Sequence, residues 1–176
     1  MIQAIDIYYR LRDEVDRQVA DLEKMHKDWM ACRKGCCSCC LDLTVWPVEF
    51  YAISEQMKTA KWPKPQLNED KECGFLDAEC GCQIYPFRPM ICRTHGLPLV
   101  YWHDEIDPPG WGVMFCEQNF RNPDEIDFGP DTTLNMDEIN EKLARINIAF
   151  LEANPALNLQ PTDRIPLRRL SKSLLE

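Results

Sequence analysis

Residues 1–31 alternate between apolar and charged positions with the period of an amphipathic helix. Apolar side chains recur every three or four residues and define one face: Tyr8, Leu11, Val15, Val19, Leu22, Met25 and Trp29. The opposite face carries charged residues such as Arg12, Asp16 and Lys24. The spacing predicts one long helix that ends at the first cysteines, where Gly35 allows the chain to reverse.

Two further helices are predicted from the same kind of periodicity. The first begins near Pro47, which a first turn tolerates, and its apolar stripe consists of Trp46, Phe50, Ile53 and Met57. The second runs from about Met136 to Ala153, and Asn135 with Glu138 three positions later resembles a capping box. Between the two helices, the polar and proline-containing stretch 61–72 indicates a loop.

Strand-like segments are short and few. The stretches LPLVYW (97–102) and GVMFC (112–116) flank a turn-rich connection, which predicts a β-hairpin. The segment from Cys73 to Cys92 shows no sustained period, so we expect irregular backbone there. The tail from Pro161 carries arginines among leucines and fits either a docked short helix or a loose segment.

These elements together predict a mainly α fold with an irregular cysteine-rich metal-binding core and a small β-hairpin. A chain of 176 residues fits one domain. Within it we distinguish an N-terminal amphipathic helix (1–31), a cysteine-cluster region (32–120) and a C-terminal helix with its tail (121–176). We expect the three helices to pack around the cysteine centre.

Composition and charge limit the kinds of partner that the protein is expected to bind. Hydrophobic residues make up 45% of the chain, which is typical of a globular protein. The net charge of -9 opposes a nucleic acid partner, which needs a basic surface. No apolar run approaches the ~18 residues that cross a bilayer, and the first residues contain no secretory signal. We therefore expect a cytoplasmic protein without a membrane partner, and the sequence indicates no particular protein partner.

All ten cysteines lie between positions 32 and 116, and five of them fall within Cys32–Cys40. Such crowding is explained by disulfides, by a metal, or by a reactive thiol site. A cytoplasmic protein keeps its thiols reduced, and the adjacent pairs Cys36–Cys37 and Cys39–Cys40 cannot easily close a bridge on themselves. Metal binding is therefore the favoured interpretation, and cysteine thiolates suit both zinc and iron–sulfur clusters.

The cysteine pattern also resembles a known family. C32-x3-C36-x2-C39-C40, then C73-x-F75-L76, then C82-x-I84-Y85-x2-R88-P89-x2-C92-R93 resembles the CxxCxxCC family of YkgJ-like proteins, described as zinc- or iron-chelating domains. The resemblance covers about Cys32 to Cys116. It implies eight metal ligands: Cys32, Cys36, Cys39, Cys40, Cys73, Cys82, Cys92 and Cys116. Cys37 and Cys80 fall outside the pattern and are left out of that set.

Other residues near the cysteines admit two interpretations each. A four-thiolate metal site carries about two negative charges, so Arg88 and Arg93 are candidates for neutralising it, and otherwise are ordinary surface arginines. Tyr85 is expected in the core beside the site. His95 has a zinc-compatible spacing from Cys92, but a loop histidine is favoured. Glu49 matches an acidic position of the family pattern and equally fits an exposed carboxylate in the first turn of a helix.

The function we expect is metal binding in a redox or structural role. The metal is zinc or an iron–sulfur cluster, with the cluster favoured because adjacent Cys39 and Cys40 suit two metal atoms better than one. No catalytic dyad stands out, which disfavours an enzyme. A metal-dependent catalyst, methylase-like or redox, and a metal carrier remain the alternatives.

Overall fold

The computed structural model describes residues 2–33, 35–105 and 107–173, and it begins with the predicted amphipathic helix. Helix α1 (Ile2–Met25) buries Tyr8, Leu11, Val15, Val19 and Leu22, as the periodicity predicts. The predicted continuation through Trp29 is wrong. His26 is buried and its Nε2 lies 2.8 Å from the carbonyl oxygen of Thr132, which draws the chain off the helix axis and leaves Met25 exposed.

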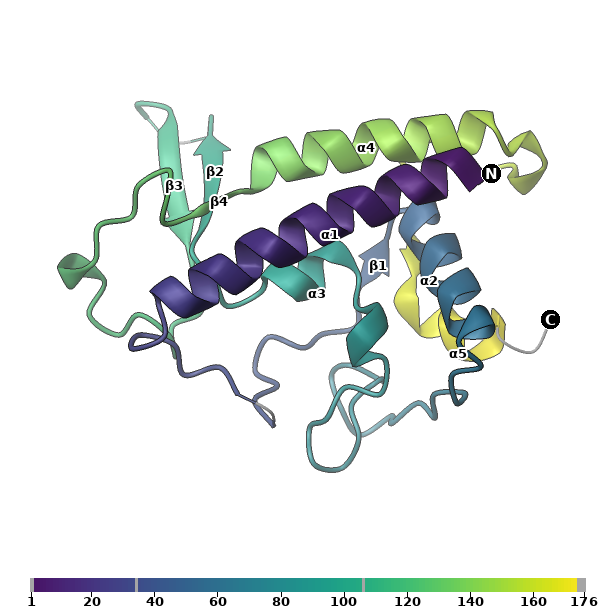
Figure 1. The fold of residues 1–176 in the computed structure, drawn as a ribbon, viewed down its shortest axis with the longest axis horizontal. Helices are drawn as coiled ribbons and strands as arrows, with labels where there is room; N and C mark the ends of the chain where they lie inside the picture. Colours follow the sequence, from purple (N-terminus) through teal and green to yellow (C-terminus); the bar gives the residue numbers. More distant parts are fainter. Residues whose placement is uncertain (1, 34, 106, 174–176) are drawn as a thin grey trace.

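Helices α2 (Pro47–Thr59) and α4 (Met136–Glu152) confirm the other two helical predictions. α1 and α4 run side by side in opposite directions, with α2 packed against both (Figure 1). The Asn135 side chain caps α4 by accepting a hydrogen bond from the backbone N–H of Glu138 at 3.1 Å. The main core lies between these three helices and contains apolar residues from each, including Tyr8, Val15, Val48, Leu143 and Phe150.

Two small sheets complete the regular structure. Strands β2 (Leu99–His103) and β3 (Gly110–Met114) form the predicted antiparallel hairpin, and β4 (Leu134–Asn135) adds to β2 in parallel. Strand β1 (Thr44–Val45) pairs with β5 (Ile165–Pro166). That pairing docks the tail, which continues as a 3₁₀ turn over Leu167–Arg169 and helix α5 (Leu170–Ser173).

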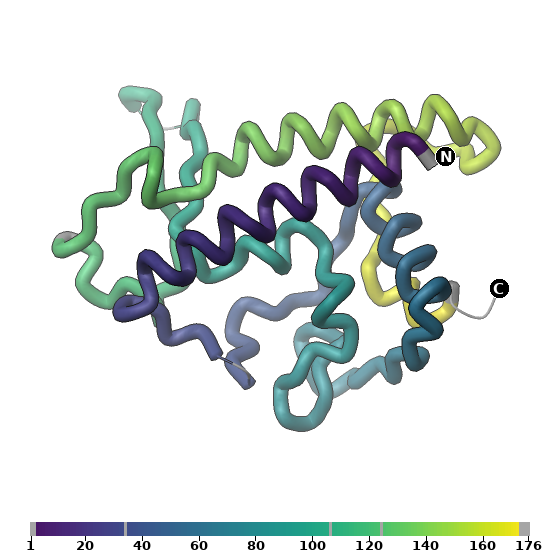
Figure 2. The backbone as a smooth tube through the Cα atoms, in the orientation of Figure 1, coloured from purple at the N-terminus to yellow at the C-terminus, as the bar shows by residue number. Residues whose placement is uncertain are grey.

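The cysteine-rich segments lie on one side of the helical layer (Figure 2). The three long helices pack on one another rather than around the cysteines, because their apolar stripes satisfy each other. Irregular backbone between Cys73 and Cys92 is confirmed, apart from a 3₁₀ turn over Tyr85–Phe87 and the start of the short helix α3 (Met90–Thr94). A second core supports this region from α2 and the tail: Val45, Phe50, Ile53, Met57, Phe75, Ile84, Phe87, Ile165, Leu167 and Leu170.

The remaining 3₁₀ turns cover Pro123–Glu125 and Pro155–Leu157. In the part of the chain that the structure describes, no helix is both long enough and apolar enough to cross a membrane.

The fold generates a prediction about Asn147, a fully buried amide on α4. Its Oδ1 accepts the backbone N–H of Val48 at 3.1 Å, in the first turn of α2, and its Nδ2 donates to the carbonyl oxygen of Pro161 at 3.3 Å. Asn147→Ala leaves both groups unpaired, so we expect a loss of about 2 kcal/mol in unfolding free energy. Chemical denaturation measures the loss. Asn140→Ala on the exposed face of α4 is the matched control, and an equal effect of both substitutions would refute the role assigned to Asn147.

Candidate metal centre

Cys73 and Cys82 each stand in a tight turn of the backbone, and the two turns, which we call corners, have the same hydrogen-bond pattern. The sulfur of Cys73 accepts the backbone N–H of Phe75, and the sulfur of Cys82 accepts that of Ile84. The two corners pair with each other, since the N–H of Gln83 donates to the carbonyl oxygen of Phe75 at 2.9 Å. Phe75 and Ile84 are buried in the second core. Burial raises the pKa of both thiols, and these backbone N–H donors lower it in part, as donors aimed at a metal-ligating sulfur do.

Cys92 comes to the same place from helix α3. Burial and, to a smaller extent, the neighbouring sulfurs of Cys82 and Cys73 raise the pKa of its thiol to about 12, although the charge of Arg88 lowers it. The helix that carries Cys92 begins at Met90, whose backbone N–H donates to Oε1 of Glu49 at 2.9 Å. The position of Cys92 therefore depends on a carboxylate from α2.

Cys39 and Cys40 complete an assembly of five thiols, which we call the inner group: Cys39, Cys40, Cys73, Cys82 and Cys92. The Cys40 sulfur interacts electrostatically with those of Cys39, Cys73 and Cys92. A hydrogen bond with Cys40 lowers the pKa of Cys39 to about 6, and the same bond together with burial raises the pKa of Cys40.

Three more cysteines form what we call the outer group: Cys32, Cys36 and Cys116. Burial raises the pKa of Cys32, whose sulfur interacts with those of Cys36, Cys116 and Cys39. Cys39 thus lies between the two groups. The structure brings all eight cysteines of the predicted ligand set into these two neighbouring groups.

Asn119 organises the outer group, and the sequence pattern does not reveal it. This buried side chain donates from Nδ2 to the sulfur of Cys32 at 3.2 Å and to the carbonyl oxygen of Gly96 at 2.7 Å. Its Oδ1 accepts the backbone N–H groups of Ala31 at 2.7 Å and of Cys32 at 3.2 Å. A Cβ on Gly96 would lie 3.0 Å from the sulfur of Cys32, so a glycine is needed there. In the sequence, the spacing C116-x2-N119 is the feature that places Asn119 close to a predicted ligand.

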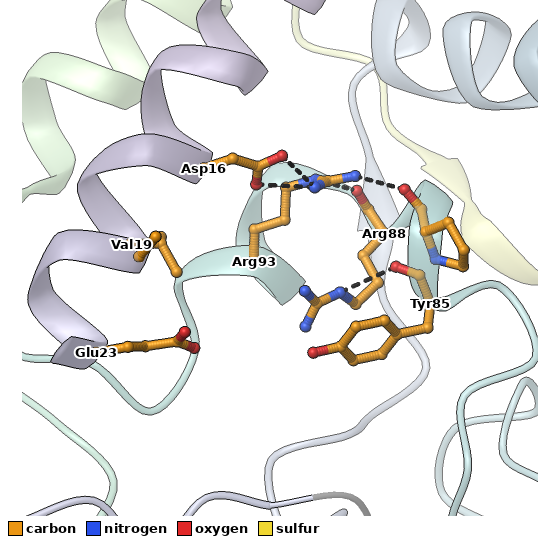
Figure 3. Close-up of a pocket in the computed structure, with 8 residues that line it drawn as sticks. Asp16, Val19, Glu23, Tyr85, Arg88 and Arg93 are labelled. Atoms are coloured by element: carbon orange, nitrogen blue, oxygen red, sulfur yellow. Dashed lines mark hydrogen bonds and ion pairs between the residues drawn. The ribbon is translucent and has the colours of Figure 1, made fainter. Parts of the chain in front are cut away.

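Arg88 is the cation of the inner group, and it lines the pocket shown in Figure 3. Its positive charge acts on the thiols of Cys39, Cys82 and Cys92. Its guanidinium carbon lies 3.6 Å from the centre of the Tyr85 ring, and its Nε donates to the Tyr85 carbonyl oxygen at 3.1 Å. The expectation that Tyr85 lies in the core is wrong, because the side chain is 57% exposed and serves as a platform for this guanidinium.

Arg93 is buried and points toward α1. Its Nη1 contacts both carboxylate oxygens of Asp16, at 2.8 and 2.7 Å, while other nitrogens donate to the carbonyl oxygens of Arg88 and Pro86 at 2.7 and 2.9 Å (Figure 3). The guanidinium therefore ties the segment before Cys92 to α1. A neutralising role toward the metal stays a prediction for Arg93.

Glu49 is more deeply placed than a helix-start carboxylate usually is. It is 3% exposed, so the expectation of an exposed carboxylate is wrong. Besides Met90, it accepts the backbone N–H of Trp46 at 3.3 Å. Burial raises its pKa to about 7, although these N–H donors and the charges of Arg164 and Arg93 lower it.

The remaining residues singled out by the sequence are His95, Cys37 and Cys80. His95 follows α3, half-buried, and burial lowers its pKa. Cys37 and Cys80 are hydrogen-bonded to each other, and the sulfur of Cys37 also interacts electrostatically with that of Cys36, a member of the outer group. In the described residues, no three thiol, imidazole or carboxylate groups already surround one point where an ion would sit. The thiols are neighbours with the right chemistry for a soft metal, and binding has to draw them inward.

Comparison with known proteins supports this interpretation of the cysteines. Residues 31–111 match the model of the CxxCxxCC family, described as a "putative zinc- or iron-chelating domain". The matched stretch ends before Cys116, so the resemblance stops short of that residue. No curated protein and no solved structure matches the chain.

The site generates a prediction about pH. The pKa of Glu49 rises from 4.5 unfolded to about 7 folded, so the folded protein holds the proton more tightly and its stability falls as pH rises from about 5 to 8. Glu49→Gln removes this titration. The unfolding free energy of the variant should therefore improve relative to wild type by roughly 2–3 kcal/mol over that range.

Denaturant titrations at several pH values measure this difference. Glu55→Gln, at an exposed position of the same helix, is the control and should leave the pH dependence unchanged. A constant difference between Glu49→Gln and wild type across the range would show that Glu49 is ionised throughout.

Proposed function

Because residues 31–111 match the model of the CxxCxxCC family, we propose that this chain is a metal-binding protein whose inner group holds an iron–sulfur cluster. Its role is electron transfer or stabilisation of the fold. The outer group supplies further thiolates at the edge of the same centre. When bound, the cluster would provide a one-electron redox couple whose potential depends on the hydrogen bonds and charges around its sulfurs.

The observation that carries the proposal is the convergence of five thiols from three separate segments. A structural zinc ion takes four ligands, whereas the inner group offers five and touches the outer group through Cys39. The adjacent residues Cys39 and Cys40 both belong to the inner group. A centre with several metal atoms accommodates such a donor set better than a single tetrahedral ion does.

The surroundings of the inner group suit a negatively charged centre. Arg88 brings a positive charge to three of its thiols, and the N–H groups of Phe75 and Ile84 donate to two of its sulfurs. Four thiolates on either Zn²⁺ or a [4Fe–4S]²⁺ core leave about two negative charges. Charge compensation therefore supports metal binding but does not distinguish the two metals.

A metal-dependent enzyme is the second candidate, and one observation favours it. A pocket of about 260 Å³ lies beside the inner group and shares Arg88 with it. Asp16, Glu23 and the exposed ring of Tyr85 also line this pocket (Figure 3). A small polar molecule held there would lie next to the metal centre.

The ligand assignment predicts opposite results for two serine substitutions. Cys92→Ser removes an inner thiol, so the purified variant should retain at most about half of the wild-type metal content, because a missing ligand weakens the whole centre. Cys37→Ser is the matched control and should retain the wild-type metal content. Elemental analysis of both variants measures the effect, and loss of metal from Cys37→Ser alone would contradict the assignment.

The identity of the metal is tested by anaerobic purification. We expect a brown protein with broad absorption near ~400 nm that contains iron and acid-labile sulfide. Thiolates also bind zinc tightly, so aerobic preparations should contain zinc in its place. A colourless anaerobic protein with about two zinc ions and no labile sulfide would instead establish a zinc-binding protein.

A further inference from the structure

Cys37 and Cys80 form a contact outside the family's cysteine pattern. The two thiols are hydrogen-bonded to each other, and both are partly exposed. The loops that carry them meet at a second point as well, because a Cβ on Gly35 would lie 3.7 Å from the carbonyl oxygen of Glu79. The contact therefore belongs to a junction between two loops that are 43 positions apart in the sequence.

Both thiols stand on closed turns. The turn of Cys80 is fastened by the carboxylate of Asp77, whose Oδ1 accepts the backbone N–H groups of Glu79 at 2.9 Å and Gly81 at 2.7 Å. Cys80 itself has a φ of 61°, in the left-handed region that side chains other than glycine seldom adopt. The carbonyl oxygen of Cys37 accepts the N–H of Cys40 at 2.9 Å. The two sulfurs are thus presented to each other by constrained backbone.

The position of Lys71 bears on whether this pair of cysteines is a metal site or a redox-active pair. Its ammonium nitrogen lies 3.7 Å from the sulfur of Cys80. A positive charge at that distance repels a metal ion, so the pair is a poor third metal site. The same ammonium group donates a hydrogen bond to the Cys80 sulfur and leaves the two cysteines free to react with each other.

We propose that Cys37 and Cys80 are a redox-active dithiol that closes to a disulfide by exchange with a small disulfide such as oxidised glutathione. The Cys80 thiolate attacks one sulfur of that molecule, whose S–S bond breaks and releases one glutathione thiolate. The sulfur of Cys37 loses its proton and attacks Cys80 in the mixed disulfide, which releases the second glutathione. Two electrons pass from the cysteines to the small disulfide, and two protons end on the two glutathione thiols.

The disulfide would tie together two loops that carry metal ligands. Cys37 lies between Cys36 and Cys39, and Cys80 lies two positions before Cys82. Oxidation would therefore connect the loop shared by the two groups covalently to the corner that holds Cys82. This inference does not depend on which metal occupies the centre.

The test treats the full-length protein, with its bound metal, with oxidised glutathione. Remaining thiols are then alkylated in denaturant, and peptide sequencing by fragmentation locates any cross-link. We expect the loss of two free thiols and one cross-link, between Cys37 and Cys80. Cross-linking of any other pair, or an unchanged thiol count, would overturn the proposal.

The role of Lys71 is tested by the rate of this reaction. Lys71→Met should slow disulfide formation by about 3–10-fold because the Cys80 sulfur loses its contact with the ammonium group, and Lys71→Arg should restore most of the rate. Lys64→Met, at an exposed position of the preceding loop, is the matched control and should react at the wild-type rate. Equal rates for Lys71→Met and Lys64→Met would rule out the assigned activation by Lys71.

Discussion

The buried carboxylate of Glu49 joins the helical core to the segment that carries the deepest thiol of the centre. One of its oxygens accepts the first backbone N–H of α3, and the other accepts the N–H of Trp46 just before α2. Two helix starts thus share one acceptor, and both would otherwise leave unpaired donors. Through these two hydrogen bonds, Glu49 holds the start of α3, which carries Cys92, against the start of α2.

Burial disfavours the charged form both of this carboxylate and of the thiols beyond it. Glu49 keeps its place through N–H donors and the nearby charges of Arg93 and Arg164. The thiols of Cys73, Cys82 and Cys92 have pKa values raised by burial, so each resists becoming a thiolate on its own. In the centre that we propose, a metal ion would reverse that preference by replacing the protons. The loops around the centre would then gain part of their order from the metal.

The sequence predicted the helices and the hairpin because each follows a periodic pattern over many residues. The sequence-based predictions were wrong where a side chain contacts residues that are far away in the sequence. His26 ends α1 early through a contact with residue 132, and Glu49 is buried by segments far away in the chain. The contact between Cys37 and Cys80 is equally invisible in one dimension, since neither residue fits the motif. The eight cysteines of the predicted ligand set lie in the two neighbouring groups, and their role in metal binding stays a prediction.

Helix α1 connects a segment of the inner group to a segment of the outer group. In its middle, Asp16 holds Arg93 and with it the chain that leads to Cys92. Beyond its last turn, the chain passes directly to Cys32, which Asn119 fastens to the segment of Cys116. The segments of Cys73 and Cys82 thus rest on buried apolar side chains, whereas the outer group depends on one amide. Because exposed hydrogen-bonded loops open more readily than packed cores do, we expect the outer group to open more readily than the segments of Cys73 and Cys82.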